Sequence, residues 1–357
     1  MGKIVILLYA VILVVMGILP LALLNTLKPA DRGFTWLEGW SEDYIGYVSY
    51  VKEGMYGRNT FVIRSLPKEG QKPTTVHLVY IALGKLGRLF HLSSPAAYHI
   101  GRIVISVALI YMVYRMLLFL LGPTQSSRAV IATMYATIAT SPSLYVFLQG
   151  HWEYRTLGWF DFSSPLHLRM FSRPHYDLGG ILFLVISFLL LSPYLSLPVK
   201  TVLIVGLSIM LGTVHPSLAL ILCMTTVLMS IILVIVKSYT RLRLFITTSL
   251  ALGLGLALSY WSIHRYPLTA ILAIEPFLAA SPISFRRFWE DFVAFGPILW
   301  FGYPGLILSF VRTNRHRFQT TFLLLWSTVQ FALFFYFYVF LVTHWYSHAF
   351  EYSNLCK

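Results

Sequence analysis

The sequence predicts an all-α polytopic membrane protein with about nine transmembrane helices, and two observations lead to this fold class. Hydrophobic residues make up 57% of the 357 residues and charged residues only 11%, a composition far from that of soluble globular domains. The apolar residues also form long runs without the alternation of apolar and polar residues that a membrane β-barrel requires. Each run is therefore expected to be a helix, which satisfies its own backbone hydrogen bonds in lipid.

The first apolar run covers residues 4–24 and directly follows Lys3. Its length of about 20 residues is what a helix needs to cross the hydrocarbon core. It is longer than the apolar region of a signal peptide and has no small-residue cleavage site before Asn25, so we expect a retained first span. The remaining expected spans of this single membrane-embedded domain, residues 1–357, are 98–121, 129–148, 178–191, 199–211, 217–236, 244–261, 297–311 and 321–342.

Three connections are too long to be simple turns: the first outer loop at 25–97, the second at 150–177 and the fourth at 262–296. Loops of this length usually carry structure or function. We expect two juxtamembrane helices in the first loop, at 43–56 and 76–92, of the amphipathic kind that lies in the membrane interface. The apolar face of the first comprises Tyr44, Tyr47, Val48 and Val51, and that of the second Leu78, Ile81, Ala82, Leu86 and Leu89, with Lys85 and Arg88 opposite.

Basic residues in short loops mark the cytoplasmic side of a membrane protein. The basic residues of four short loops alternate correctly with the spans if the N-terminus is cytoplasmic. The first loop has Arg115 and Arg128, the second Lys200, the third Lys237, Arg241 and Arg243, and the fourth Arg312, Arg315 and Arg317. All 13 acidic residues then lie on the outer side or at its border, so acid–base or metal chemistry must be extracytoplasmic. The net charge of +14 follows from this bias and from contact with anionic lipids of the bilayer, and it requires no nucleic-acid partner.

Glu42 and Asp43 are adjacent carboxylates that follow the first span, in a chain with few acidic residues. A carboxylate at this place can deprotonate an acceptor hydroxyl, bind a divalent cation or carry a coupled proton. The sequence has no Gly-rich phosphate loop, metalloprotease helix or nucleophile turn. An enzyme of this composition is therefore expected to take an activated donor from the membrane.

Basic residues occur at the outer ends of the expected spans. His99 and Arg102 lie at the start of the second span, and Arg173 and His175 precede the fourth. A guanidinium at headgroup height can bind a phosphate through two hydrogen bonds, although an interfacial Arg is more often a snorkelling anchor. His215, in the turn before the sixth span, either contributes to the same cavity or only breaks the hairpin.

Over residues 1 to about 180, the order of these features resembles polytopic glycosyltransferases of the GT-C fold. The resemblance is to bacterial mannosyltransferase-like and lipid A arabinosyltransferase-like groups. It is carried by Glu42-Asp43 followed by residues 44–54, by the run 80–92 leading into Tyr98-His99-Ile100-Gly101-Arg102, and by Arg173-Pro174-His175-Tyr176.

The resemblance implies that Asp43 is the general base, with Glu42 as substitute or helper. It also implies that Arg102, Arg173 and His175 hold the phosphate of a polyprenyl-phosphate sugar. Some relatives of this kind require Mg²⁺ or Mn²⁺ and others do not, so a divalent cation at Asp43 and Glu42 remains open.

We therefore expect an inverting glycosyltransferase of a bacterial or archaeal plasma membrane, with its active site facing outside. It would transfer a sugar from a polyprenyl-phosphate carrier to an extracytoplasmic glycan, lipid or protein. One alternative is a transporter or flippase for a lipid-linked or anionic solute, which is disfavoured because the mid-span stretches contain no Asp or Glu and show no repeat. The other is a non-catalytic membrane subunit whose long loop docks a partner.

Overall fold

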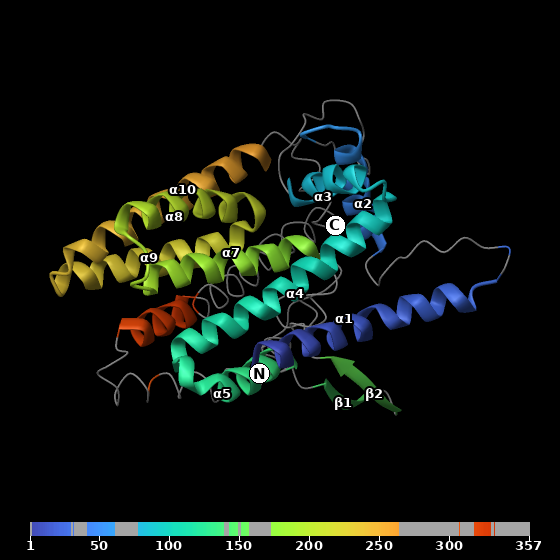
Figure 1. The fold of residues 1–357 in the computed structure, drawn as a ribbon, viewed down its shortest axis with the longest axis horizontal. Coiled ribbons are helices and arrows are strands. Elements are labelled where there is room, and N and C mark those ends of the chain that lie inside the picture. Colours follow the sequence, from blue (N-terminus) through green and yellow to red (C-terminus); the bar gives the residue numbers. More distant parts are fainter. Residues whose placement is uncertain are drawn as a thin grey trace, which may run out of the picture.

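The structure is a computed structural model that describes residues 2–29, 31, 41–60, 78–138, 143–148, 151–156, 173–263, 307, 318–329 and 332. Within these residues the protein is helical apart from one two-stranded hairpin (Figure 1). Five of the described helices are long and apolar enough to cross a membrane: α4 (Ser94–Leu121), α7 (Pro174–Leu191), α8 (Leu197–Val214), α9 (Pro216–Ile235) and α10 (Tyr239–Ile263). These helices are those of a multi-pass integral membrane protein.

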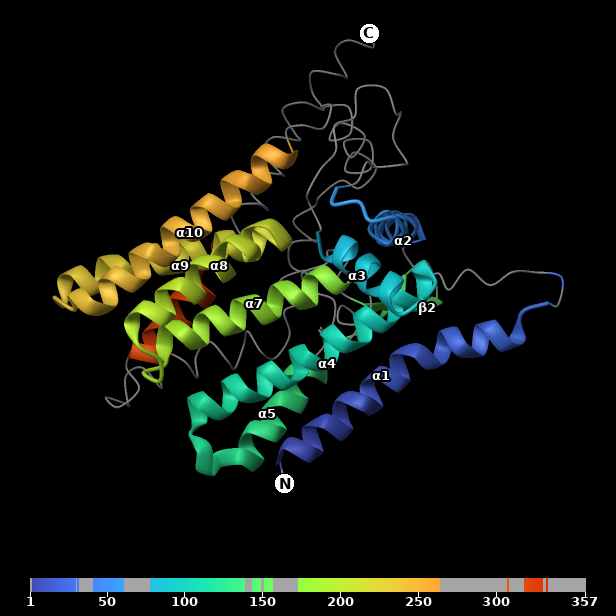
Figure 2. The same ribbon diagram turned by 45° about the horizontal axis from the view of Figure 1, so that its top comes forward.

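Helix α1 (Gly2–Leu27) contributes a further apolar segment at Gly2–Val15. It runs antiparallel to α4 and contacts α5 (Ser126–Ile138), which follows the short 3₁₀ turn η1 (Pro123–Gln125). The Tyr9 hydroxyl is 2.6 Å from the Thr137 hydroxyl, so a polar contact joins α1 to α5. Figure 2 shows α1, α4 and α5 as one layer beside the other spans.

Helices α8, α9 and α10 form a second packed group, and α7 lies between this group and α4 (Figures 1 and 2). The closest crossing in this group is between α8 and α10. A Cβ added to Gly212 would lie 2.6 Å from the Gly255 Cα, so only glycine permits this approach. Small residues of this kind are what allow helix backbones to pack closely in membranes.

The spans run alternately up and down, so their connections fall at two ends. One end holds Gly2, the α4–α5 turn, the α7–α8 turn and the α9–α10 turn (Figure 1). We call it the basic end, because it carries the exposed side chains of Lys3, Arg128, Lys237, Arg241 and Arg243. The helical segment 318–329 also begins there, since the Arg241 guanidinium lies 4.2 Å from the centre of the Phe318 ring.

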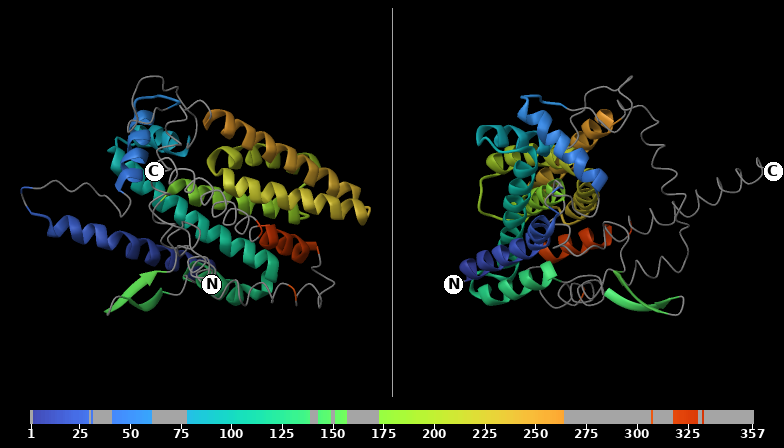
Figure 3. Two further views of the ribbon diagram at one scale, coloured as in Figure 1. Left: turned by 180° about the vertical axis from the view of Figure 1, so that it is seen from behind. Right: turned by 90° about the vertical axis from the view of Figure 1, so that its right-hand side faces the viewer.

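The opposite end is covered by two short helices, α2 (Ser41–Met55) and α3 (Leu78–Leu89). They pack on each other and on the start of α4, as the view from behind also shows (Figure 3). The two helices expected in the first loop are thus present, with bounds close to the expected ones. Their backbones cross at Gly84, where an added Cβ would overlap with the Val51 carbonyl oxygen and lie 2.9 Å from the Gly54 Cα.

The expected apolar face of α2 is correct, because Tyr44 and Val51 are buried and Tyr47 and Val48 pack beside them. Of the expected apolar face of α3, Ile81 is buried within the protein, whereas Leu78, Leu86 and Leu89 are exposed, as are Lys85 and Arg88. Helix α3 buries a different side within the protein. The buried side comprises Val79, Tyr80, Ile81, Leu83, Gly84 and Gly87. In a membrane protein the strongly apolar side of a helix can face lipid, while glycines mark the side that packs on protein.

The expected third span, residues 129–148, is wrong in its second half. Helix α5 ends at Ile138, and residues 143–148 form strand β1 (Ser143–Leu148), which pairs antiparallel with β2 (His151–Thr156). Tyr145, Val146 and Phe147 belong to the aromatic and β-branched types that favour strands. The strand β2 lies in the expected second outer loop.

The other expected spans agree with the described helices to within a few residues, and the fourth and fifth are longer than expected, with 18 residues each. The expected span 297–311 and residues 330–342 of the ninth fall almost entirely outside the described residues. The same holds for most of the fourth outer loop, 262–296, and for residues 157–172 of the second.

Candidate functional site

A cluster of tyrosine and histidine rings lies where α2 and α3 meet the ends of the spans. Its centre is the stacked pair Tyr47 and Tyr80, with ring centroids 4.5 Å apart. From Tyr80 the contacts continue to Tyr98 at 6.0 Å and to His175 at 5.8 Å. We call this the ring cluster, and its members are Tyr44, Tyr47, Tyr80, Tyr98, His99, His175, Tyr176 and His215.

Two hydrogen bonds connect the short helices to the spans through this cluster. The Tyr44 hydroxyl of α2 is 3.0 Å from Nε2 of His99 at the start of α4. The Tyr80 hydroxyl of α3 is 2.6 Å from Nδ1 of His175 in the first turn of α7. Burial raises the pKa of the Tyr80 phenol well above its ordinary value, although the charge of Arg173 acts in the opposite direction, so this group is neutral at physiological pH.

Two ionisable side chains, Arg102 and Asp177, are buried where α4 packs on α7. The Ser106 hydroxyl of α4 donates a hydrogen bond of 2.5 Å to the Asp177 carboxylate of α7. Arg102, one helical turn before Ser106, is 0% exposed and interacts electrostatically with Asp177.

His215 makes two kinds of contact in the structure, a helix cap and a ring contact, and it is not among the residues that line the cavity beside α4. Its Nδ1 caps the start of α9 by accepting a hydrogen bond of 3.3 Å from the Leu218 backbone N–H, and it lies 3.0 Å from the Ser217 hydroxyl. Its ring also packs edge-on against Tyr176, with centroids 4.9 Å apart. Helix α7 comes so close here that a Cβ on Gly179 would lie 2.7 Å from the His215 Cβ.

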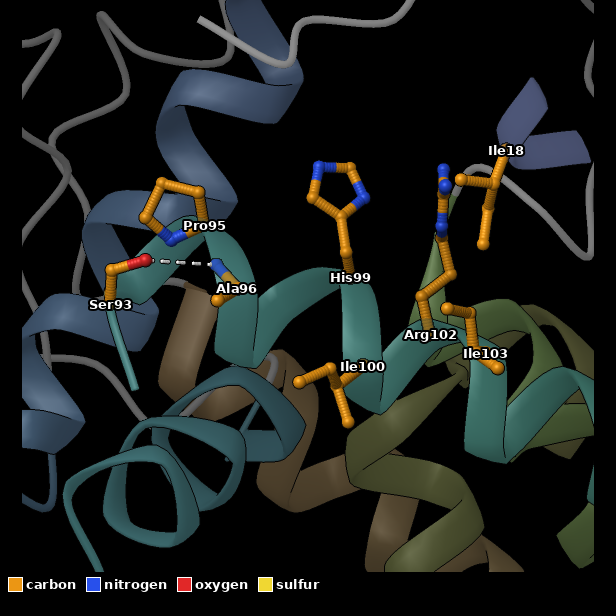
Figure 4. Close-up of a pocket in the computed structure, with 8 residues that line it drawn as sticks. All are labelled: Ile18, Ser93, Pro95, Ala96, His99, Ile100, Arg102 and Ile103. Carbon is orange, nitrogen blue, oxygen red and sulfur yellow. Dashed lines mark hydrogen bonds between the residues drawn. The ribbon is translucent and has the colours of Figure 1, made fainter. Parts of the chain in front are cut away.

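A cavity of about 500 Å³ lies beside the ring cluster, between α1 and the start of α4. Most of its wall is apolar, and the polar groups are Ser93, His99 and Arg102. His99 and Arg102 project from α4 in the same direction (Figure 4). Arg102 has no surface exposed to solvent, and its guanidinium group lies beside the His99 imidazole at the cavity wall (Figure 4). The apolar lining residues are Ile18, Pro95, Ala96, Ile100 and Ile103.

The structure brings the predicted basic residues into two neighbouring groups. His99 and Arg102 share the cavity wall, and His175 and His215 belong to the ring cluster, with centroids 6.3 Å apart. Arg173 instead packs on Tyr176, with its guanidinium 5.5 Å from the ring centre and a hydrogen bond of 3.2 Å to the hydroxyl.

Glu42 and Asp43 lie in the first turn of α2, immediately before Tyr44, and their side chains fall outside the described residues. Among the side chains that the structure does describe, no group of three or more His, Cys, Asp or Glu residues is arranged to hold a metal ion.

Sequence reasoning missed Asp177 and the tyrosines of the ring cluster as site residues. Asp177 had a sequence signal, because it is an acidic residue in the first turn of a span. Arg102 and Ser106 are spaced by four residues, so they share one face near the start of another span. The tyrosines had no distinguishing signal, since tyrosine is also the usual residue of the membrane interface.

Comparison of the chain with family models, with curated proteins and with solved structures finds no match.

Proposed function

We propose that the protein is an inverting glycosyltransferase that moves a sugar from a polyprenyl-phosphate carrier to an extracytoplasmic acceptor. The observation that supports this most directly is the hydrogen bond between Tyr44 and His99. It joins the helix that begins with Glu42 and Asp43 to the cavity wall that carries His99 and Arg102. A carboxylate-bearing helix and a basic, apolar-walled cavity are the two parts that this reaction needs.

The cavity suits a phosphate-bearing lipid. Its apolar residues Ile18, Ile100 and Ile103 match a prenyl chain, and the charge of Arg102 favours an anionic headgroup next to His99. A phosphate leaving from a sugar gains negative charge, which a cation already in place stabilises. Arg173, His175 and His215 would extend this positive surface toward the sugar.

Asp43 would act as the general base, with Glu42 as its helper. The acceptor oxygen forms a bond to the anomeric carbon while the bond from that carbon to the phosphate oxygen breaks. The acceptor proton passes to the Asp43 carboxylate, and the electron pair of the broken bond remains on the lipid phosphate. Attack from the side opposite the phosphate inverts the anomeric configuration. No step requires a metal, although carboxylates such as Asp43 and Glu42 are the ligand type that Mg²⁺ or Mn²⁺ prefers.

The orientation belongs to the same proposal. The exposed cations of the basic end favour the cytoplasmic side, which would put the N-terminus in the cytoplasm and the ring cluster outside. Carrier and acceptor would then meet on the outer face of the plasma membrane.

The test uses the full chain in lipid nanodiscs with a panel of polyprenyl-phosphate hexoses and pentoses, and with membrane extract as acceptor. Release of polyprenyl phosphate and gain of sugar mass on the acceptor are measured by mass spectrometry. We expect Asp43→Asn, alone and combined with Glu42→Gln, to lower the rate by about 10²–10⁴-fold. The matched control is Asp31→Asn, an exposed carboxylate of the same loop, which should retain activity. Full activity in the Asp43 and Glu42 variants would refute the mechanism.

A further inference from the structure

Helix α3 presents an apolar edge to its surroundings, formed largely by residues of the apolar face expected from the sequence. Leu86 is 53% exposed, Leu89 69% and Phe90, just after the helix, 67%. Leu78 lies on the same side and is also exposed. We call these four residues the α3 edge. So much exposed apolar surface on one side of a short helix indicates a contact with something other than water.

The edge cannot turn inward, because the opposite side of α3 is fixed by close backbone contacts. Gly84 packs against the Val51 carbonyl and Gly54 of α2, and an added Cβ at Gly87 would lie 2.6 Å from the Ala97 Cβ of α4. These contacts hold α3 rigidly between α2 and α4. Its outward side is therefore a permanent feature of the fold.

The same contacts fix the level of the edge relative to the membrane. Ala97 belongs to the first turn of α4, a spanning helix, and only residues 90–93 separate α3 from α4. A spanning helix starts close to the boundary between headgroups and hydrocarbon. Leu86, Leu89 and Phe90 must therefore lie at this boundary.

Cations accompany the edge. Lys85 and Arg88 are exposed on α3, and Lys52 is exposed on α2. Lys85 donates a hydrogen bond to Asn59, a residue that follows α2. An apolar strip with lysine and arginine beside it is the pattern of a helix that inserts among anionic headgroups.

We propose that the α3 edge is embedded in the headgroup region of the bilayer, with Lys85 and Arg88 facing anionic lipid phosphates. Because α3 is fixed to α2 at Gly84, the edge sets the height of α2 above the membrane. One consequence rests on the proposed function: Glu42 and Asp43 would be held at the level of the carrier phosphate.

Spin labels test the location. The two native cysteines are replaced by serine, and a nitroxide is placed at Leu86, at Leu89 or, as control, at Tyr56, an exposed residue just after α2. The full chain is studied in nanodiscs of phosphatidylcholine and phosphatidylglycerol. We expect labels at Leu86 and Leu89 to collide more with oxygen than with a water-soluble nickel complex, and the label at Tyr56 to show the reverse. Equal nickel access at all three positions would overturn the proposal.

A second measurement tests the role of charge. In nanodiscs of phosphatidylcholine alone, the oxygen-to-nickel ratio at Leu86 should fall. In the double variant Lys85→Gln and Arg88→Gln, the ratio should no longer depend on the lipid. A lipid-independent ratio in the parent protein would refute the contact with anionic headgroups.

Neither measurement uses turnover, so its outcome is independent of the transfer assay. Loss of transfer in Asp43→Asn together with water-exposed labels would refute only this inference. Embedded labels in a protein without transfer activity would refute only the proposed function.

Discussion

The hydroxyl of Tyr80 and Nδ1 of His175 are joined by a hydrogen bond of 2.6 Å between residues 95 positions apart in the chain. Both side chains are buried. This bond links α3, which lies outside the spans, to the first turn of α7, and it therefore ties the α2–α3 pair to the bundle.

Replacement of Tyr80 by phenylalanine should destabilise the protein. The change keeps the ring contacts with Tyr47 and Tyr98 but leaves the buried His175 nitrogen without this partner, at a cost of about 1–3 kcal/mol. The midpoint of thermal unfolding in detergent measures the loss. The control is Tyr56→Phe, since Tyr56 is exposed and its hydroxyl contributes little. Equal midpoints for the two variants would contradict the role of the bond.

The raised pKa of Tyr80 predicts a loss of stability at alkaline pH. The unfolded chain releases this phenolic proton near pH 10, whereas burial keeps the folded phenol protonated to higher pH. The stability from the neutral phenol is therefore complete below about pH 10 and falls above it by up to about 1.4 kcal/mol per pH unit.

Denaturant titrations from about pH 9 to pH 11 test this, with Tyr80→Phe as the comparison. The variant should lose less stability than the parent over the upper part of the range. Identical slopes would show that the Tyr80 phenol does not contribute to the alkaline transition.

Glycine at position 84 should be required for the α2–α3 crossing. Alanine there would overlap with the Val51 carbonyl, forcing the helices apart at a cost of about 1–3 kcal/mol. Gly46→Ala is a matched change within α2, where only the Tyr50 hydroxyl lies within reach, at 3.9 Å. It should stabilise α2 by up to about 1 kcal/mol. Unfolding monitored by circular dichroism distinguishes them, and similar shifts in one direction would argue against the crossing.

His215 variants separate its two roles. Asparagine can replace Nδ1 as the cap of α9 but cannot replace the ring contact with Tyr176, whereas alanine removes both. We therefore expect His215→Ala to lose about 0.5–2 kcal/mol and His215→Asn to regain most of it. If both variants retain transfer activity, the residue serves only as a cap. Loss of transfer in a stable His215→Asn protein assigns the ring to the site.

Asp177 and Ser106 should be energetically coupled. Asp177→Asn changes the carboxylate that accepts the hydrogen bond, and Ser106→Ala removes the donor to it. A double-mutant cycle on the free energy of unfolding should give a coupling of about 0.5–3 kcal/mol. Additive effects, as expected for distant sites, would exclude a direct contact.

The spans were predictable because the length and hydropathy of an apolar run are enough to identify a helix that crosses a membrane. Helices α4 and α7 to α10 lie where the apolar runs place them. The hairpin at 143–156 was missed because its first strand is as apolar as the preceding helix, and apolarity does not distinguish the two. The packing face of α3 was missed for another reason: Gly84 and Gly87 carry no hydropathy signal, yet they are what allows α3 to pack against α2 and α4.

The site was predictable only in part. Arg102 and His99 stand out in sequence as basic residues at the end of a span, and they do meet at one cavity. The pairing of Tyr80 with His175, or of Ser106 with Asp177, depends on which helices become neighbours. That information is absent from any local pattern, since it is set by packing between segments far apart in the chain.

The link between Tyr80 and His175 also constrains how the protein is made. Helix α3 leaves the ribosome well before α7, so the α2–α3 pair must wait at the membrane surface until α7 has been inserted. The ring cluster also contains His215 at the start of α9, so it is complete only after α9 has followed α7. A defect in the insertion of α7 would leave α2 and α3 exposed and open to membrane-protein quality control.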